Sequence, residues 1–282
     1  MGPLGRTAKK VPEITAIFWV IKLFTTAMGE ATSDYSVHAI NPVLAVVAGF
    51  LAFVVALAIQ LRTDRYVPWR YWLAVVMVAV FGTMAADVLH VRFSVPYADS
   101  AALYGAVLAI VLVAWYLTER TLSIHSITTL RRELFYWATV SATFAVGTAA
   151  GDMTATTLHF GYLASAFLFL GLIALAAFGY FVAHLNEVAT FWFAYILTRP
   201  LGASVADWLG FPHQVGGEGV GHGVVALVTS AVIVLLVTGV SIRSRRADDS
   251  VPLATAPPLG FRQHAASHPV SHVQPLGQLE SN

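Results

Sequence analysis

The chain has 282 residues, of which 57% are hydrophobic and only 11% charged, and its net charge at pH 7 is +1. Soluble domains usually carry about 25% charged residues, so this composition excludes an ordinary soluble enzyme, a nucleic-acid-binding protein and a disordered chain. It predicts an integral membrane protein. Cysteine is absent, which excludes disulfides, thiolate zinc sites and iron–sulfur clusters.

Eight apolar stretches are long enough to cross a bilayer, which takes roughly 20 helical residues. They lie at about 13–35, 42–61, 70–90, 100–118, 132–153, 160–182, 188–209 and 221–241. Their apolar runs are continuous, whereas the strands of a membrane barrel alternate. The predicted fold class is therefore an all-α integral membrane protein with eight transmembrane helices.

Basic side chains gather on one side of the predicted membrane. With eight spans, that side holds Arg6, Lys9, Lys10, Arg62, Arg65, Arg70, Arg120, Arg131, Arg132, Arg243, Arg245 and Arg246, and the opposite side holds Arg92. Because cytoplasmic loops carry the excess of Lys and Arg, both termini are expected in the cytoplasm.

Three regions follow from these assignments. Residues 1–10 are expected to form a basic cytoplasmic segment, and residues 11–241 the membrane domain. Residues 242–282 are rich in proline and serine and are expected to be a disordered cytoplasmic tail. The tail histidines, spaced by four, are interpreted as solvated side chains, because Pro269 argues against a helix that would align them; they are His264, His268 and His272.

One pattern, [FY]-W-x(9)-G-x(4)-D, occurs four times without a gap. Its tryptophans are Trp19, Trp72, Trp137 and Trp192, its glycines Gly29, Gly82, Gly147 and Gly202, and its aspartates Asp34, Asp87, Asp152 and Asp207. Each repeat holds two spans, so the four repeats, at about 11–61, 66–118, 131–182 and 186–241, should be parallel to one another. The glycines are interpreted chiefly as close-packing positions.

The four motifs read FWVIKLFTTAMGEATSD, YWLAVVMVAVFGTMAAD, YWATVSATFAVGTAAGD and FWFAYILTRPLGASVAD. In them the chain resembles a family of bacterial membrane proteins built from four tandem copies of a two-span repeat of unknown function, each marked by a tryptophan. The resemblance covers about residues 11–241. It implies a multi-pass protein of the bacterial inner membrane, and it implies no reaction.

A polar stripe follows the marked span of each repeat. Steps of four residues lead through Lys22, Thr26, Glu30 and Asp34 in the first repeat, and they end at Thr83–Asp87, Thr148–Asp152 and Ala203–Asp207 in the others. Residues four apart share one helix face. The odd spans are therefore expected to turn their stripes toward a common interior, with the even spans as a lipid-facing shell.

Charged residues inside spans are rare and often functional. The four aspartates and Glu30 outnumber the two cations in the odd spans, Lys22 and Arg199, and carboxylates held close together require protonation or a cation. Candidate cation-binding residues are thus Asp34, Asp87, Asp152, Asp207 and Glu30, with Lys22 and Arg199 as counter-charges. Two other readings stay open: the aspartates reach interfacial water, or they stabilise helix packing.

Oxygen ligands with nearby imidazoles suit a divalent ion such as Mn²⁺. The candidate metal ligands are Asp34, Asp87, Asp152, Asp207, His38 and His90. A plain interfacial position is the alternative for His38, and equally for His159, His213 and His222. In the seventh span, Pro200 is expected to interrupt and bend the helix, either as a broken helix of a substrate site or equally as a packing kink. Arg199 beside it is placed to bind an anion or to lock Asp34 or Glu30.

No Walker loop, HExxH or GxSxG motif is present, so no enzyme activity is predicted. The sequence predicts a secondary transporter or exporter of a small cation, with a divalent metal such as manganese as one candidate substrate, coupled to protons through the intramembrane aspartates. Its expected partners are the lipid bilayer, the cation and protons. The alternative is a non-transporting membrane scaffold or sensor whose aspartates are structural.

Overall fold

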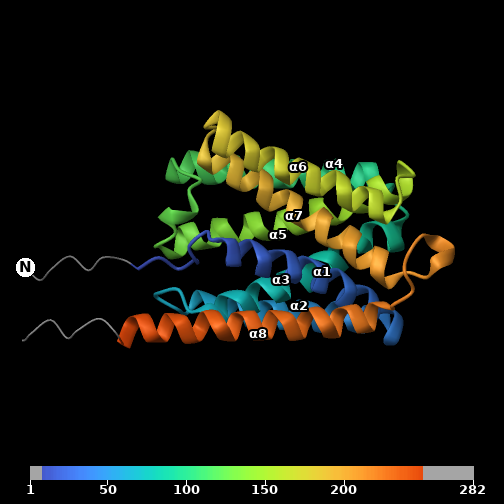
Figure 1. Cartoon of the computed structure of the whole chain (residues 1–282), viewed down its shortest axis with the longest axis horizontal. Helices are drawn as coiled ribbons and strands as arrows, with labels where there is room; N and C mark the ends of the chain where they lie inside the picture. The colour runs from blue at the N-terminus through green and yellow to red at the C-terminus, as the bar shows by residue number, and fades with distance from the viewer. Residues whose placement is uncertain (1–7, 250–282) are drawn as a thin grey trace, which may run out of the picture. The chain divides into compact units, whose positions relative to one another are not determined.

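The computed structural model describes residues 8–249, and within that range every regular element is helical (Figure 1). The α-helices are α1 (Ala16–Ala39), α2 (Pro42–Leu61), α3 (Pro68–Phe93), α4 (Tyr97–Glu119), α5 (Leu130–Asp152), α6 (Tyr162–Ala183), α7 (Glu187–Gly210) and α8 (His222–Asp249). The chain divides into two units, 1–244 and 245–282. The helical packing below concerns the first unit.

Several helices begin at capping residues that the sequence supplies. Asn41 accepts hydrogen bonds from the backbone of Val43 and Leu44 at the start of α2, and Asn186 accepts one from Ala189 at the start of α7. Pro42 and Pro68 occupy the first turns of α2 and α3, where no backbone N–H is needed. These signals separate one apolar run from the next and fix the helix boundaries.

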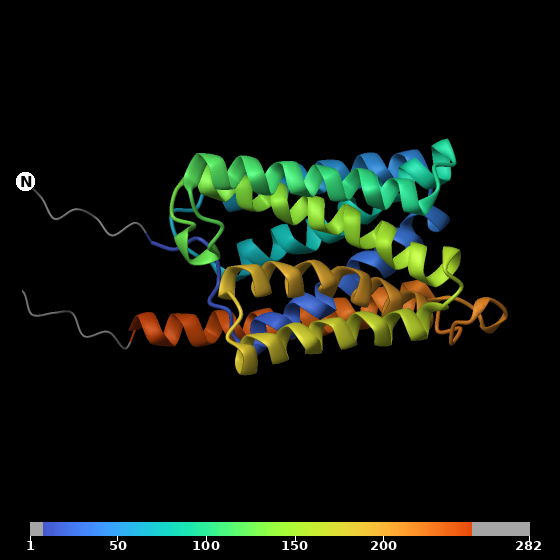
Figure 2. The same ribbon diagram turned by 90° about the horizontal axis from the view of Figure 1, so that it is seen from above.

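The odd-numbered helices form an inner ring. Helix α1 packs against α3, α3 against α5, α5 against α7, and α7 against α1. Three outer helices pack mainly on the inner helix of the following repeat: α2 on α3, α4 on α5 and α6 on α7. In Figure 1, α4 and α6 lie along one side, α2 and α8 along the other, and the inner helices between them. In the view turned by 90°, α2 and α4 lie along one side and α6 and α8 along the other (Figure 2).

Burial separates the two kinds of helix. The most apolar 18-residue stretch of α3 is 50% buried, whereas the corresponding stretches of α2 and α4 are each 11% buried. The outer helices therefore present their apolar surface outward, as helices in contact with lipid do. Among residues 8–249, five helices are long and apolar enough to cross a membrane: α2, α3, α4, α6 and α8. Helices α1, α5 and α7 are less apolar because they carry the buried polar residues of the ring.

The repeated glycines hold the inner ring together. A Cβ on Gly29 would lie 2.5 Å from Ala79 Cβ, one on Gly82 2.8 Å from Phe144 Cβ, and one on Gly147 2.5 Å from Arg199 Cγ. A Cβ on Gly202 would lie 2.6 Å from Thr26 Cβ, so the fourth repeat returns to the first. Each glycine thus meets the residue seven positions after the tryptophan of the next repeat. Because the same contact occurs between every pair of neighbouring repeats, the four inner helices form a closed ring.

Two layers seal the end of the ring where the inner helices begin. The aromatic residues that precede the motif tryptophans are all buried; they are Phe18, Tyr71, Tyr136 and Phe191. Beyond them, Lys10 Nζ lies 2.8 Å from Glu133 Oε2, and Gln60 Nε2 donates to Glu133 Oε1 at 2.9 Å. The N-terminal segment is held there by backbone hydrogen bonds from Lys10 to Ile127 and from Tyr66 to Lys9. We call this end, with Lys10 and Glu133, the basic end.

Two expectations about helix limits require correction. Helix α8 continues to Asp249, so residues 242–249 are helical rather than part of a disordered tail. Helix α7 is continuous through Pro200, so the broken-helix interpretation is wrong, and Pro200 packs beside Gly147 and Gly151, as its packing interpretation expects. Residues 1–7 and 250–282, including the tail histidines, lie outside the described residues.

The glycine ring predicts that Gly29→Ala destabilises the protein by about 1–3 kcal/mol, because the new methyl group meets the backbone of α3 at Ala79 and overpacks the contact. The melting temperature in detergent measures this effect. Gly171→Ala is the matched control, since a Cβ there meets nothing within 4 Å and alanine favours the helix. Equal melting temperatures for the two variants would contradict the packing role.

Candidate functional site

One guanidinium joins the four repeats at the centre of the ring. Arg199 on α7 is fully buried, and its Nη2, with two N–H groups, lies within hydrogen-bonding distance of side-chain oxygens of Glu30 on α1, Thr83 on α3 and Thr148 on α5. The bond to Thr148 Oγ1 measures 2.7 Å. Of the two partners expected for Arg199, Glu30 is therefore the carboxylate that it holds.

The three acceptors stand at equivalent places in their repeats. Glu30, Thr83 and Thr148 each follow their motif tryptophan by eleven residues, and the fourth equivalent, Ala203, is buried without a polar side chain. Arg199 itself lies one helical turn before Ala203 and reaches across to the other three. Sequence steps of four placed all these residues on one face. Only the packing of the four inner helices shows that Arg199 is the common partner of the other three.

Lys22, the second expected counter-charge, faces aromatic rings instead of carboxylates. Its Nζ lies 4.2 Å from the centre of the Phe144 ring and 4.4 Å from that of Tyr195. Arg199 approaches the same Phe144 ring, with Cζ 5.4 Å from its centre. No described side chain or backbone group forms a hydrogen bond with Lys22 Nζ, which is buried. Cation–π attraction is therefore the favourable electrostatic contact of this ammonium group.

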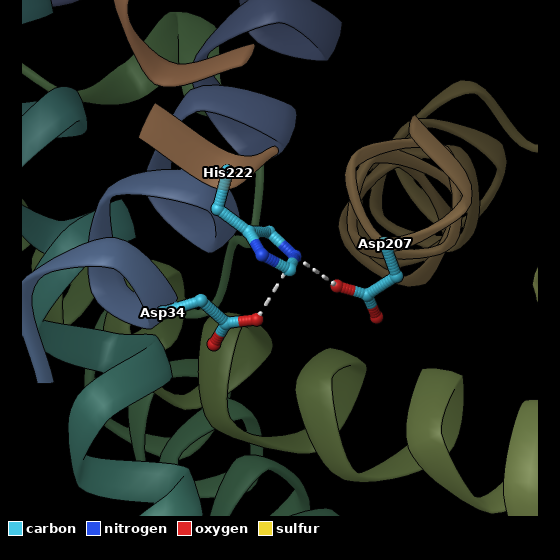
Figure 3. Close-up of side chains that lie close together, drawn as sticks. All are labelled: Asp34, Asp207 and His222. Atoms are coloured by element: carbon cyan, nitrogen blue, oxygen red, sulfur yellow. Dashed lines mark ion pairs between the residues drawn. The ribbon is translucent and has the colours of Figure 1, made fainter. Parts of the chain in front are cut away.

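Two of the four motif aspartates meet a histidine from outside the repeat motif (Figure 3). His222 Nε2 lies 3.2 Å from Asp34 Oδ2 and 3.7 Å from Asp207 Oδ1, so the imidazole stands between the two carboxylates. Asp207 is 4% exposed, and the side chains of Asp34 and His222 are 17% and 14% exposed. The three residues come from α1, α7 and the first position of α8.

The other two aspartates are half-buried on α3 and α5. Within the described part of the chain, the carboxylates of Asp87 and Asp152 form no hydrogen bond and no ion pair. Asp152 is the last residue of α5, and the chain then widens into a π-helical turn, Met153–Thr157. Such π-turns recur at functional sites. The third repeat thus differs from the others directly after its aspartate.

The two histidines expected as metal ligands lie outside the group formed by Asp34, Asp207 and His222. His38 is exposed, and its Nδ1 lies 2.6 Å from the backbone carbonyl oxygen of Asp34. His90 stacks on Tyr97 with ring centres 3.8 Å apart, and its Nδ1 lies 3.0 Å from the carbonyl oxygen of Val95. In each of the two histidines, Nδ1 thus lies within hydrogen-bonding distance of a nearby backbone carbonyl oxygen.

The four motif aspartates share one electrostatic setting. The inner helices alternate with outer ones along the chain, so all four run in the same direction, and each places its aspartate in its C-terminal part. A helix C-terminus carries a partial negative charge of about half an elementary charge. Four such ends together with four carboxylates form a region that favours cations, and we call it the aspartate end.

His222 is the site residue whose role the sequence left open. It stands outside the repeated motif, and the loop 211–221 separates it from α7, so neither the four-residue step nor the repeat spacing links it to Asp34. A histidine at the start of an apolar helix was the available signal. Its place beside Asp34 and Asp207 follows only from the contact between the first and last repeats.

Comparison with protein families identifies the repeats independently. The model of the family described as Repeat of Unknown Function (DUF347) matches residues 17–66, 70–121, 135–185 and 190–246. No curated protein and no solved structure matches the chain. The four matches cover most of the chain and confirm the four tandem repeats inferred from the tryptophan motif. The chain therefore belongs to the family of the Repeat of Unknown Function (DUF347).

Proposed function

We propose that this protein is a secondary transporter of a small cation in the bacterial inner membrane, with the cation exchanged for protons at the aspartate end. The observation that carries the proposal is the convergence of four parallel inner helices, each with one motif aspartate near its C-terminus. The candidate cation-binding residues are Asp34, Asp87, Asp152 and Asp207, with Glu30 below them. A cation or protons would neutralise carboxylates gathered in this way.

The proposal takes all eight helices as membrane spans with both termini in the cytoplasm. Helices α1, α5 and α7 are similar in length to the apolar ones, and the charged residues in the middle of α1 and α7 are all buried: Lys22, Glu30 and Arg199. Charges inside spans are tolerated when they face a bundle interior and find partners there. The basic end would then be cytoplasmic, in agreement with the excess of Lys and Arg in the loops.

The polar and aromatic layers suggest how a cation would be kept from leaking. Below the aspartates, Arg199 closes the centre with Glu30, Thr83 and Thr148. Nearer the basic end, Lys22 and the aromatic residues fill the ring. A buried positive charge repels cations, so ions would enter from the aspartate end. Passage to the other side would require Arg199 to release its three partners, and protonation of Glu30 would weaken one of those bonds.

The scaffold alternative makes a different prediction about the aspartates. If the protein is a non-transporting scaffold and these residues only stabilise packing, their neutralisation lowers stability, and the parental protein itself shows no cation flux. Asp99 offers a control at the same end of the bundle, because it is an exposed acidic residue in the first turn of α4. Comparing variants of motif aspartates with a variant of Asp99 distinguishes the two functions.

We expect Asp152→Asn and Asp207→Asn to reduce cation flux in proteoliposomes by about tenfold or more, because the intramembrane charge that binds the cation or proton is removed. Flux is driven by a pH gradient and compared at equal amounts of folded protein. Asp99→Asn should keep the parental flux. Parental flux in both motif variants, with protein levels maintained, would overturn the proposal.

Glu30→Gln should lower stability by about 3–5 kcal/mol, because it leaves the buried Arg199 guanidinium without its counter-charge. The double variant Glu30→Gln/Arg199→Met removes both charges and should recover most of the melting temperature while flux stays abolished. Thr83→Val, which removes one neutral acceptor, should cost about 1.5–3 kcal/mol. A Glu30→Gln variant as stable as the parent would contradict the central role of the ion pair.

A further inference from the structure

We propose that Asp34, Asp207 and His222 bind a divalent transition-metal ion of the class of Zn²⁺, Co²⁺ and Mn²⁺. The inference rests on the proposed function, because it names the class of cation that the aspartate end would take. Its evidence is the position of three potential ligand atoms, one from each side chain, all within 4.8 Å of one another. Figure 3 shows the imidazole directed between the two carboxylates.

The separations between these atoms fit a shared metal ion. Metal–nitrogen and metal–oxygen bonds of about 2.0–2.2 Å in a tetrahedron place neighbouring ligand atoms roughly 3.3–3.6 Å apart. His222 Nε2 lies 3.2 Å from Asp34 Oδ2 and 3.7 Å from Asp207 Oδ1. These two distances bracket that range. Two of the three pairs of ligand atoms therefore already have the spacing of a coordination shell, and the two carboxylate oxygens lie within 4.8 Å of each other.

Hydrogen bonding alone does not account for the group. Asp207 is 4% exposed, and within residues 8–249 its Oδ1 has no hydrogen-bond donor and His222 Nε2 has no hydrogen-bond partner. One imidazole N–H can satisfy one carboxylate, so a second buried carboxylate would remain without a donor. Unsatisfied buried polar atoms are costly and rare. A divalent ion satisfies all three atoms and neutralises both carboxylates.

The histidine ring is held in place before any ion binds. A Cβ on Gly210 would lie 2.5 Å from His222 Nε2, so glycine at this position makes room for the ring. Phe211 packs against the imidazole at a steep angle, with ring centres 4.6 Å apart. Packing of this kind fixes the direction of a metal ligand and lowers the entropic cost of binding.

The ligand set also selects the class of ion. An imidazole nitrogen with two carboxylates suits first-row transition metals, whereas Mg²⁺ and Ca²⁺ prefer oxygen ligands alone. Three protein ligands leave at least one coordination position for water, which distinguishes such a site from a closed structural one with four protein ligands. A transporter must release the ion that it binds, and an open coordination position allows such exchange.

The test measures metal binding to the purified, untagged full chain in detergent. The tail residues His264, His268 and His272 are replaced by Gln throughout, so that only imidazoles of the membrane domain remain available. Co²⁺ binding is followed by its visible absorption, and Zn²⁺, Mn²⁺ and Mg²⁺ by the rise in melting temperature that binding to the folded state produces.

We expect Co²⁺, Zn²⁺ and Mn²⁺ to bind and Mg²⁺ to have no effect at the same concentration. His222→Gln and Asp34→Asn should each weaken Co²⁺ binding by about tenfold or more, because each removes one ligand. His213→Gln is the matched control, since that imidazole lies in loop 211–221 with its Nδ1 2.9 Å from the carbonyl oxygen of Gly217. Two ligand variants keep the test valid if one of them fails to fold.

Unchanged Co²⁺ binding in both ligand variants, or equal effects of Mg²⁺ and Co²⁺, would overturn this inference. Flux measurements on the same variants separate it from the proposed function. Cation flux that persists in His222→Gln without transition-metal binding overturns the metal site and leaves the transporter. Selective metal binding without flux of any cation supports the site and overturns the transporter.

Discussion

Burial of the Arg199 guanidinium is the interaction on which the rest of the structure depends. A charge that loses contact with water must find partners, because an isolated buried ion is destabilising by many kcal/mol. Arg199 finds them on three other helices, in Glu30, Thr83 and Thr148. The four inner helices must therefore stand at one register around it, and this register also brings the four aspartates to the same end.

Close approach of the helices makes that convergence possible. Each motif glycine removes the side chain that would separate two inner helices, and each meets the same position of the next repeat. Lipid offers little hydrophobic drive for helices to associate, so small residues and polar contacts are what hold such a ring. The outer helices α2, α4 and α6 follow from the same arrangement, because each covers the inner helix of the following repeat.

The features common to the four repeats form the ring of inner helices, whereas several of its charged residues each occur in one repeat only. Glu30 belongs to the first repeat, Glu133 to the third and Arg199 to the fourth, and the equivalent positions elsewhere carry uncharged residues. His222 adds a further departure where the fourth repeat returns to the first, beside Asp34 and Asp207. Four identical repeats would offer four equivalent joins between neighbouring inner helices. Arg199, Glu30 and His222 lie where α1 meets α7, and this is why the proposed cation site is placed there.

The sequence by itself determined the helical class, the four repeats and the stripe that carries Glu30 and the aspartates, because composition and spacing are local properties of a chain. It also indicated which spans lie inside, since polar residues four apart share a face. It did not determine the continuity of α7 through Pro200 or the surroundings of Lys22, which depend on packing against α5. Only the tertiary structure decided that Arg199 holds Glu30, and that His222, and not His38 or His90, lies with Asp34 and Asp207. Those contacts join helices far apart in the chain, and no repeat period or helix spacing encodes them.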